Sequence, residues 1–258
     1  MKHQPNSDGT VGKALEVLEM VAAAGRPVRF SDLLPQSPYP KATLYRFLQT
    51  LTHQGMLAHD EDRGTYALGV RLVRLAHAAW AQSSLAPLAR RYLDELAAAS
   101  GETIHLAQMD NGQVLYVDKR NAAAPIEMFS SAGKVGPAYC TGVGKAILAF
   151  LPDAEIAAAM DRQSFHRFTP RTLDSPGKLR DELLEVRRLG YAVDREEHEP
   201  GIICCAAPVL AQSGRVLGAL SITSTTGRTS LAALEAWADR IKDTAARIAA
   251  EAESWRFP

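Results

Sequence analysis

One stretch of the sequence decides the fold of the N-terminal part of the chain: PKATLYRFLQTLTHQGMLAHDEDRGTYAL, residues 40–68. Its apolar residues recur at helical spacing, at Leu44, Phe47, Leu48 and Leu51. This spacing predicts a helix that begins near Pro40, and Gly55 is expected to end it as a C-cap. Two short runs, residues 56–59 and 65–68, then predict a β-hairpin around Asp60–Gly64.

Two further helices are expected upstream of this stretch. Apolar residues from Val11 to Ala22 follow the pattern of an amphipathic helix, which Gly25 and Pro27 end. A second helix is expected to open with Ser31 as its N-cap. Pro35 and Pro38 fall in and just after it, so we expect this helix to be short or distorted. Short helices followed by a hairpin are typical of a winged helix-turn-helix domain.

The helix near Pro40 has a polar face suited to DNA. No acidic residue occurs between Leu34 and His59. Arg and Gln side chains can make bidentate contacts with guanine and adenine, while Lys, Thr and Tyr can contact phosphates. Such a face is also typical of an ordinary solvated helix, but the helix order and the wing favour DNA. We therefore predict DNA contacts by Ser31, Lys41, Ala42, Thr43, Tyr45, Arg46, Gln49 and Arg63.

The rest of the chain predicts a connecting helix and a second domain. Residues 70–84 form an amphipathic helix, and Trp80 near its end suggests packing against a partner helix or subunit. A further helix is expected after Ser84. Beyond Gly101, strands are expected at 102–109, 113–119, 126–129, 191–195, 202–210 and 216–223, with helices at 144–151, 176–189 and 231–253. We predict an α+β chain with a winged helix-turn-helix domain (1–69), a linker helix (70–84) and a sensor-like α/β domain (85–258) built on one central antiparallel sheet.

Composition restricts the class of protein. The 258 residues carry 29 basic and 29 acidic side chains, and 47% are apolar, which excludes wholesale disorder. The longest apolar run, Ile202–Ala211, contains Pro208 and is too short to span a bilayer. The N-terminus lacks the apolar run of a secretory signal, and the 3 cysteines do not form a disulfide framework. We expect a cytoplasmic protein without a membrane partner. Zero net charge argues against binding nucleic acid by bulk electrostatics, and leaves a local basic surface open.

The segment Thr141–Ala146, TGVGKA, invites comparison with a phosphate-binding loop. The Walker pattern fails, because Tyr139 stands where its first glycine is needed and Ala146 where it needs Ser or Thr. Two readings remain. The loop opens a helix whose free amides suit a carboxylate, or it is a tight turn that only packs close to the sheet.

The run Asp194–Glu199, DREEHE, is densely charged. Acid–base catalysis or a metal site is conceivable, but such a run is usually a solvated loop. Asp194, at the end of a strand, is the residue expected to point into the domain. Histidines such as His105 and His166 are interpreted as packing or surface residues.

Two strands carry further candidates. Alternation places Cys204 and Cys205 on opposite faces of the sheet, where buried structural cysteine is the default. Ser221 and Thr223 share one face, and they suit either a polar ligand or neighbouring backbone groups. Nothing in the spacing of Cys and His predicts a metal site, a cofactor or a nucleophile pair.

Taken together, these segments resemble the IclR family of bacterial transcriptional regulators. The resemblance is carried by PKATLYRFL (40–48), YCTGVGKAILA (139–149), GYAVDREEHEPGIIC (190–204) and the pairing of AAPV (206–209) with GALSI (218–222). Within the family, the chain is most similar to the KdgR branch of sugar-acid regulators. TLYRFLQT (43–50), ETIHL (102–106) and EEHEPG (196–201) carry that likeness.

The resemblance implies a GAF-like effector domain after the linker helix, and a homodimer that can pair into a tetramer. It implies a ligand over the sheet, with the Gly142 and Val143 amides against a carboxylate. Asp194 and Cys204 would contact the polar part of the ligand, Ser221 and Thr223 would supply hydroxyls, and Met128 would form an apolar wall. Gly136, where a relative can have a bulky residue, would leave room for a six-carbon acid.

The function that follows is a DNA-binding repressor of sugar-acid catabolic genes, relieved by a small carboxylate such as a 2-keto-3-deoxygluconate-like acid. The alternative within the family is an aromatic-acid-responsive regulator or an activator. A hydrolase using Cys204 or Cys205 is a third reading that leaves the winged helix unexplained, so we expect no enzyme. Residues 1–80 carry 9 basic and 7 acidic side chains, which predicts DNA contact on a small face around Lys41, Arg46 and Arg63.

Overall fold

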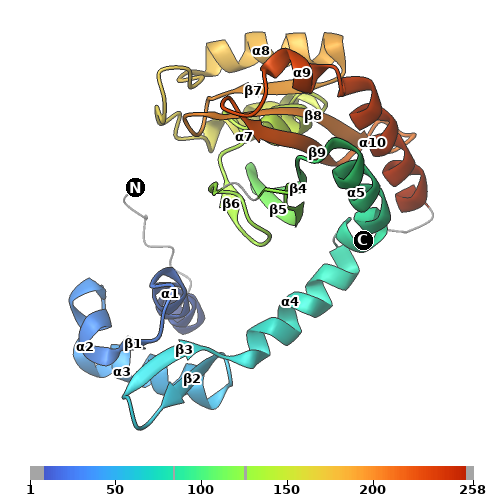
Figure 1. Cartoon of the computed structure of the whole chain (residues 1–258). Helices are drawn as coiled ribbons and strands as arrows, with labels where there is room; N and C mark the ends of the chain where they lie inside the picture. Colours follow the sequence, from blue (N-terminus) through green and yellow to red (C-terminus); the bar gives the residue numbers. More distant parts are fainter. Residues whose placement is uncertain (1–8, 84, 125–126, 254–258) are drawn as a thin grey trace. The chain divides into compact units, whose positions relative to one another are not determined.

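The structure is a computed structural model that describes residues 9–83, 85–124 and 127–253 (Figure 1). It divides into two compact units, Met1–Gln82 and Ser83–Pro258. Each unit has its own hydrophobic core. None of the helices in the described ranges is long and apolar enough to cross a membrane.

The first unit is a winged helix-turn-helix, as the sequence predicts. Leu44 and Leu48 of the third helix pack with Val17 of the first and Leu57 of the wing in one core. The wing is an antiparallel hairpin, to which a short strand that the sequence analysis did not predict adds a third strand. Its elements are α1 (Gly9–Ala23), β1 (Val28–Arg29), α2 (Phe30–Leu33), the 3-10 turn η1 (Leu34–Gln36), α3 (Lys41–His53), β2 (Leu57–Asp60), β3 (Thr65–Leu68) and α4 (Val70–Ser83).

The second helix is short and distorted, as its prolines predict. Four α-helical residues are followed by η1, which has Pro35 in its first turn, because proline removes an amide donor and fixes its own φ. The expected N-cap was wrong. Ser31 lies inside α2, and the N-cap is Arg29, whose amide donates to the Asp32 carboxylate at 3.2 Å. An acidic side chain in the first turn therefore replaces the serine cap.

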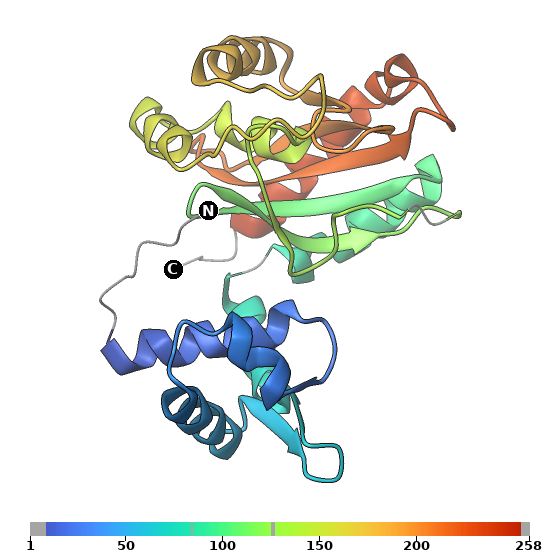
Figure 2. The ribbon, with the colours of Figure 1, turned by 90° about the vertical axis from the view of Figure 1, so that its left-hand side faces the viewer.

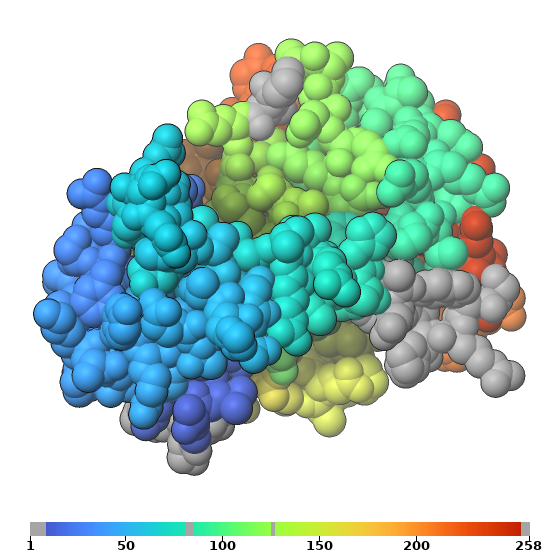
Figure 3. All heavy atoms as spheres, turned by 90° about the horizontal axis from the view of Figure 1, so that it is seen from below, coloured from blue at the N-terminus to red at the C-terminus, as the bar shows by residue number. Residues whose placement is uncertain are grey.

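Helix α4 exposes its apolar residues. Val70, Val73 and Leu75 are 75%, 64% and 51% exposed. The space-filling view draws atoms of the wing and of α4 in cyan at the surface of the first unit (Figure 3). Large exposed apolar side chains on one helix are unusual for a monomer surface, and packing against a partner helix stays a prediction.

The second unit is built on one antiparallel sheet of six strands in the order β6-β5-β4-β9-β8-β7. Its longest pairing joins β8 to β9, with Cys204 opposite Thr223 and Ala206 opposite Ser221. The strands are β4 (Thr103–Asp110), β5 (Gln113–Arg120), β6 (Val135–Gly136), β7 (Ala192–Arg195), β8 (Ile202–Leu210) and β9 (Val216–Thr225). This arrangement confirms the predicted central antiparallel sheet.

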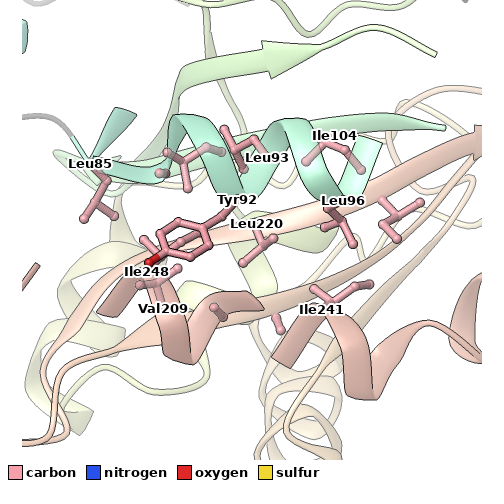
Figure 4. Close-up of a cluster of buried hydrophobic side chains, with 14 of the residues drawn as sticks. Leu85, Tyr92, Leu93, Leu96, Ile104, Val209, Leu220, Ile241 and Ile248 are labelled. Carbon is pink, nitrogen blue, oxygen red and sulfur yellow. The ribbon is translucent and has the colours of Figure 1, made fainter. Parts of the chain in front are cut away.

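Helices cover both faces of this sheet. On one face lie α5 (Ala86–Ser100), α9 (Leu231–Glu235) and α10 (Ala238–Glu253), packed on Leu220 and Val209. On the other lie α6 (Gly142–Leu148), α7 (Asp153–Asp161) and α8 (Pro176–Leu189). Figure 2 shows α7 and α8, in yellow, together on one side of the sheet. Figure 4 shows the apolar cluster on the opposite side, where Tyr92, Leu93 and Leu96 of α5 meet Ile241 and Ile248 of α10.

Several predicted elements differ from the structure. Of the strand expected at 126–129, Ile126 lies outside the described residues and Glu127–Phe129 is not a strand. The reason is that the Phe129 amide donates to the Glu199 carboxylate instead of to a strand partner. The edge strand is Val135–Gly136. Helix α7 was not predicted, α6 begins two residues earlier than expected, and the last helix is interrupted between α9 and α10.

Candidate DNA-facing helix and effector cavity

Helix α3 separates its two faces as the sequence predicts. The side toward the core buries Leu44, Phe47, Leu48 and Leu51. Pro40 is the N-cap and accepts hydrogen bonds from the amides of Thr43 and Leu44 at 2.9 and 3.0 Å. The predicted contact residues on the outer side are exposed, except Thr43, which is half-buried: Lys41, Ala42, Thr43, Tyr45, Arg46 and Gln49.

Contacts within the unit hold some of these side chains in place. The Tyr45 ring packs edge-on against Phe30, with ring centroids 6.1 Å apart, while 54% of Tyr45 stays exposed. The Gln49 amide donates to the Tyr66 hydroxyl at 3.5 Å. Arg46 places its guanidinium carbon 5.8 Å from the centre of the Phe47 ring. Its charged end therefore remains on the outside of the helix.

The wing turn is more acidic than the helix. Arg63 is exposed there, and its amide donates to the Asp60 carboxylate at 3.1 Å. Asp60, Glu61 and Asp62 share the same exposed turn. Ser31 is exposed in α2, and its hydroxyl donates to the Asp32 carboxylate at 3.4 Å. Of the predicted DNA-contacting residues, those on α3 thus lie in the most basic surroundings.

A cavity in the second unit lies between the sheet and the start of α6. All seven residues predicted to bind the effector line it, although they come from separate segments of the chain: Met128, Gly142, Val143, Asp194, Cys204, Ser221 and Thr223. Its volume is about 30 Å³, which is room for about two water molecules at 10–15 Å³ each. The space beside Gly136 that we expected to be open is occupied, because a Cβ there would lie 3.3 Å from the Phe129 ring.

Strand register brings the sheet residues together. Asp194 of β7 is opposite Cys204 of β8, which is opposite Thr223 of β9. In the next row Ser221 of β9 is opposite His105 of β4. Residues opposite each other in an antiparallel sheet point to the same face. Polar side chains from four strands therefore converge under the first turn of α6.

Helix α6 approaches the sheet very closely at its first turn. A Cβ on Gly142 would lie 2.3 Å from the Cys204 sulfur, and one on Gly144 would lie 2.3 Å from the Ala138 carbonyl oxygen. The reading of this loop as a tight turn that packs on the sheet is thereby correct. The reading as an anion-binding turn remains compatible with it, since the first-turn amides of a helix have no intrahelical acceptor.

The wall opposite this turn is uncharged. Burial, with a smaller contribution from Lys119, lowers the pKa of His105 to about 3. Its Nε2 lies 2.7 Å from the Ser130 hydroxyl and its Nδ1 lies 3.1 Å from the Thr223 hydroxyl. The prediction of a packing or surface residue therefore missed a buried histidine that lines the cavity.

Behind the cavity lies a buried ionic cluster. Lys145 is fully buried, and its ammonium lies 2.8 Å from Glu182 and 2.5 Å from Glu197. Burial and then the charge of Glu197 raise the pKa of Asp194 to about 7. Burial also raises the pKa of Glu197, against the attraction of Lys145. The interpretation of the charged run as a solvated loop is wrong at Glu197, whose Oε2 is buried without a hydrogen-bond partner in the described structure.

Residues 127–130 after β5, called the covering segment below, line one side of the cavity with Met128 and Ser130. Phe129 donates its amide to both oxygens of Glu199, at 3.1 and 3.0 Å, and Lys119 donates to the Ser130 carbonyl at 2.9 Å. Burial raises the pKa of Glu199, but hydrogen bonds from His198 and the Phe129 amide lower it by more, so that the net shift is downward. A carboxylate thus helps to hold the segment over the cavity.

Sequence reasoning missed half of the cavity wall. The further residues that line it are His105, Tyr116, Ser130, Thr141, His198, Glu199 and Ile202. His105 lies on β4, and alternation alone assigns it a face without showing that β4 pairs with β9. The pairing of β4 with β5 shifts in register between Leu106 and Ala107. Because of this shift Tyr116 lies opposite Ala107, and its side chain points to the face of the sheet that carries the cavity.

The cysteines have no features of a nucleophile. Burial raises the pKa of Cys204 and raises that of Cys205 to about 12, so both are thiols. Among the residues that the structure describes, no group of three His, Cys, Asp or Glu side chains could hold a metal ion.

Comparisons with known proteins connect both parts to one family. The profile of the bacterial transcriptional regulator IclR C-terminal domain matches residues 77–250, and that of the IclR helix-turn-helix domain matches residues 10–61. The HTH-type transcriptional regulator KdgR of Escherichia coli (strain K12) is 31% identical over 255 residues, covering 99% of this chain and 97% of KdgR. The regulator XynR of the same organism is 30% identical, covering 90% of this chain and 92% of XynR. The crystal structure of Thermotoga maritima IclR matches with a TM-score of 0.76 at 28% identity, covering 94% of this chain and 98% of that one.

Proposed function

This chain belongs to the IclR family of bacterial transcriptional regulators, and on that premise we propose that it is a repressor of sugar-acid catabolic genes. Residues 1–69 bind operator DNA, residues 70–84 form the linker helix between the two domains, and residues 85–258 bind a small carboxylate that relieves repression. Its family is one of DNA-binding regulators and not of enzymes. The observation that carries the effector proposal is the convergence of seven predicted residues on one cavity.

Operator recognition is assigned to the outer face of α3. Arg46 and Gln49 are one turn apart and exposed, which suits contacts with base edges in the major groove. Lys41, Thr43 and Tyr45 are placed to contact phosphates on either side. In a homodimer, two such helices enter successive major grooves of a pseudo-palindromic operator, and two dimers can pair into a tetramer.

Effector binding is assigned to the cavity under α6. The amides of Gly142 and Val143 donate hydrogen bonds to the carboxylate of the effector, and Asp194 and Cys204 contact the polar part of the acid. Ser221 and Thr223 add hydroxyls, and Met128 forms an apolar wall. The sugar-acid class is supported by the polar wall of the cavity and by the likeness to KdgR over nearly the whole chain.

The effector relieves repression by a population shift. The effector stabilises the form of the protein that binds it more tightly. It can change the DNA affinity by no more than the ratio of its own affinities for the two forms of the protein. The cavity is nearly filled in the structure described here, so a six-carbon acid requires the covering segment to move outward.

The DNA assignment is tested with Arg46→Ala in a gel-shift assay on the DNA upstream of this gene and its neighbours. We expect operator binding to be lost, because the variant removes the exposed guanidinium of α3, while effector affinity by calorimetry is unchanged. Lys13→Ala, an exposed basic residue on α1, is the matched control and keeps operator binding. Normal operator affinity of Arg46→Ala contradicts the assignment of α3.

The effector assignment is tested by thermal shift with 2-keto-3-deoxygluconate and 4-hydroxybenzoate. We expect stabilisation by the sugar acid, and its loss in Asp194→Ala without weaker DNA binding. Stabilisation by the hydroxybenzoate alone would replace the sugar-acid proposal by the aromatic-acid alternative.

A further inference from the structure

We propose that His105 is a specificity-determining residue of the effector cavity, which selects an acid with a single carboxylate and a hydroxylated chain over one with a second carboxylate. This inference rests on the proposed function, because it names the class of effector that the same cavity takes. It concerns the wall of the cavity opposite α6, to which the sequence resemblance assigns no histidine.

His105 connects hydroxyl groups from two separate parts of the chain. Its Nε2 lies 2.7 Å from the Ser130 hydroxyl of the covering segment. Its Nδ1 lies 3.1 Å from the Thr223 hydroxyl and 3.5 Å from the Ser221 hydroxyl, both on β9. The two β9 hydroxyls are themselves 3.3 Å apart. One imidazole therefore organises the three hydroxyls that line this wall.

A neutral imidazole makes these hydroxyls unlike one another. One ring nitrogen donates and the other accepts, since only the imidazolium donates from both. The hydroxyl next to the accepting nitrogen must donate to it and keeps its lone pairs for a ligand. The hydroxyl next to the donating nitrogen accepts and keeps its proton for a ligand. The three hydroxyls of this wall thus offer both donors and acceptors. Ligand hydroxyls can pair with both, whereas a carboxylate only accepts and leaves the acceptors of the wall unpaired.

The charges around the cavity point to the same class of ligand. Among the lining residues that the structure describes, the ionisable acids are Asp194 and Glu199, and none is Lys or Arg. The Lys145 ammonium is held by Glu182 and Glu197 behind the cavity. The Lys119 ammonium donates to the Ser130 carbonyl and does not line the cavity. A second carboxylate would therefore meet the Glu199 carboxylate and an uncharged wall, with no cation among the lining residues, which is unfavourable at low dielectric.

The test uses three six-carbon 2-oxo acids that differ only beyond the 2-oxo acid head. 2-Keto-3-deoxygluconate carries hydroxyls, 2-oxohexanoate carries none, and 2-oxoadipate carries a second carboxylate. Calorimetry with the full-length protein compares the wild type, His105→Leu and His105→Gln, the last of which keeps one donor and one acceptor. We expect the wild type to bind the hydroxylated acid most tightly.

The variants distinguish recognition of the ligand hydroxyls by His105 from a role of this side chain in packing alone. In His105→Leu we expect the hydroxylated acid to lose roughly 10- to 100-fold in affinity, the usual result of leaving polar groups unpaired, and 2-oxohexanoate less than about 3-fold. His105→Gln should restore most of the loss. Equal losses for all three acids in His105→Leu, or tight binding of 2-oxoadipate by the wild type, overturn the role of His105 and leave the proposed function standing.

A second measurement observes the imidazole in the wild-type protein. Nitrogen-15 NMR of the wild-type imidazole, assigned by the signal missing in His105→Gln, should show one protonated nitrogen from pH 5 to 8. Its shifts should change with 2-keto-3-deoxygluconate and not with 2-oxohexanoate. An imidazolium in this range, or no response to the hydroxylated acid that binds, contradicts the inference. Failure of the wild type to bind any of the three acids overturns the proposed effector class and this inference with it.

Discussion

At the scale of single residues, the ionisation of Asp194 links stability to pH. Burial and the neighbouring Glu197 raise its pKa from 3.8 to about 7. Between these two values the folded state holds a proton that the unfolded state has released. The contribution of Asp194 to stability is therefore greatest below about pH 4 and is lost as the pH rises through about 7.

We predict that Asp194→Asn is more stable than the wild type at pH 8 and about equally stable at pH 4. The amide removes the cost of a buried carboxylate, which for a pKa raised from 3.8 to about 7 is of order 4 kcal/mol, and its oxygen can still accept from the Glu197 amide. Urea unfolding at the two pH values measures the difference. Asp174→Asn, at a half-buried carboxyl whose pKa is lowered by its hydrogen bond with Lys178, is the control and should show no such gain. A gain that is the same at both pH values contradicts the assigned cause.

At the scale of elements, the close approach of α6 to β8 is what shapes the cavity. The start of α6 can lie directly over the strand because Gly142 has no side chain, and the Cys204 sulfur occupies the space that a Cβ would need. The contact is between one helix residue and one strand residue, so a pair of substitutions can isolate it.

We predict that Gly142→Ala destabilises the chain by about 1–3 kcal/mol, the usual cost of overpacking. Adding Cys204→Ala should recover part of the loss, since the remaining neighbour, the Ala206 Cβ, is at an ordinary 3.4 Å. Chemical unfolding of the single and double variants gives the coupling free energy. Gly177→Ala in α8, where nothing lies within 4 Å, is the control and should be neutral or slightly stabilising. Additive effects of the two substitutions would show that the sulfur is not the obstacle.

The buried ionic cluster joins α6, α8 and the loop after β7. We predict that Lys145→Met costs about 3–5 kcal/mol of unfolding free energy, because it leaves Glu197 buried without its partner. Lys145→Met combined with Glu197→Gln should be less destabilised than the single variant. Lys178→Met breaks the exposed pair with Asp174 and should cost no more than about 1 kcal/mol. The measurement is urea unfolding, and a neutral Lys145→Met would contradict a stabilising role for the pair.

At the scale of the whole molecule, charge sets how the protein depends on salt when it binds DNA. The 9 basic and 7 acidic side chains of residues 1–80 leave little excess charge. The acidic side chains of the wing turn offset part of this small positive charge near Arg63. We therefore expect DNA contact to be concentrated on α3.

We predict a shallow salt dependence of operator affinity. If Lys41, Arg46 and Arg63 supply the charged contacts, the slope of log K against log salt is about −3 per chain and no steeper than about −6 for two chains. Fluorescence anisotropy on operator DNA between 50 and 200 mM salt measures it. A slope near −10 would require a larger basic surface than the one assigned here.

The spacing of apolar residues along the chain determined much of the secondary structure of this protein. The helices of the first unit, its hairpin and most strands of the second follow from spacing along the chain, because a helix or strand buries one face at a fixed period. Asp194 could be singled out because it ends a strand. One exception also has a local cause, since Asp32 accepts from the Arg29 amide at the start of α2 where Ser31 was expected to be the cap. The other has a long-range cause, because the Phe129 amide donates to Glu199, 70 residues away along the chain, where a strand was expected.

Tertiary structure decided which of these side chains meet. The pairing of β4 with β9 places His105 beside Ser221 and Thr223, more than a hundred residues away along the chain. Period alone gives each residue a face and says nothing of which strands are neighbours. The same holds for Glu197. Its position in a densely charged run predicts a solvated side chain, but in the structure it is buried and forms an ion pair with Lys145, 52 residues away along the chain. The sequence by itself thus determined most of the elements and the family, while contacts between distant segments decided the cavity, because its walls exist only once the strands have paired.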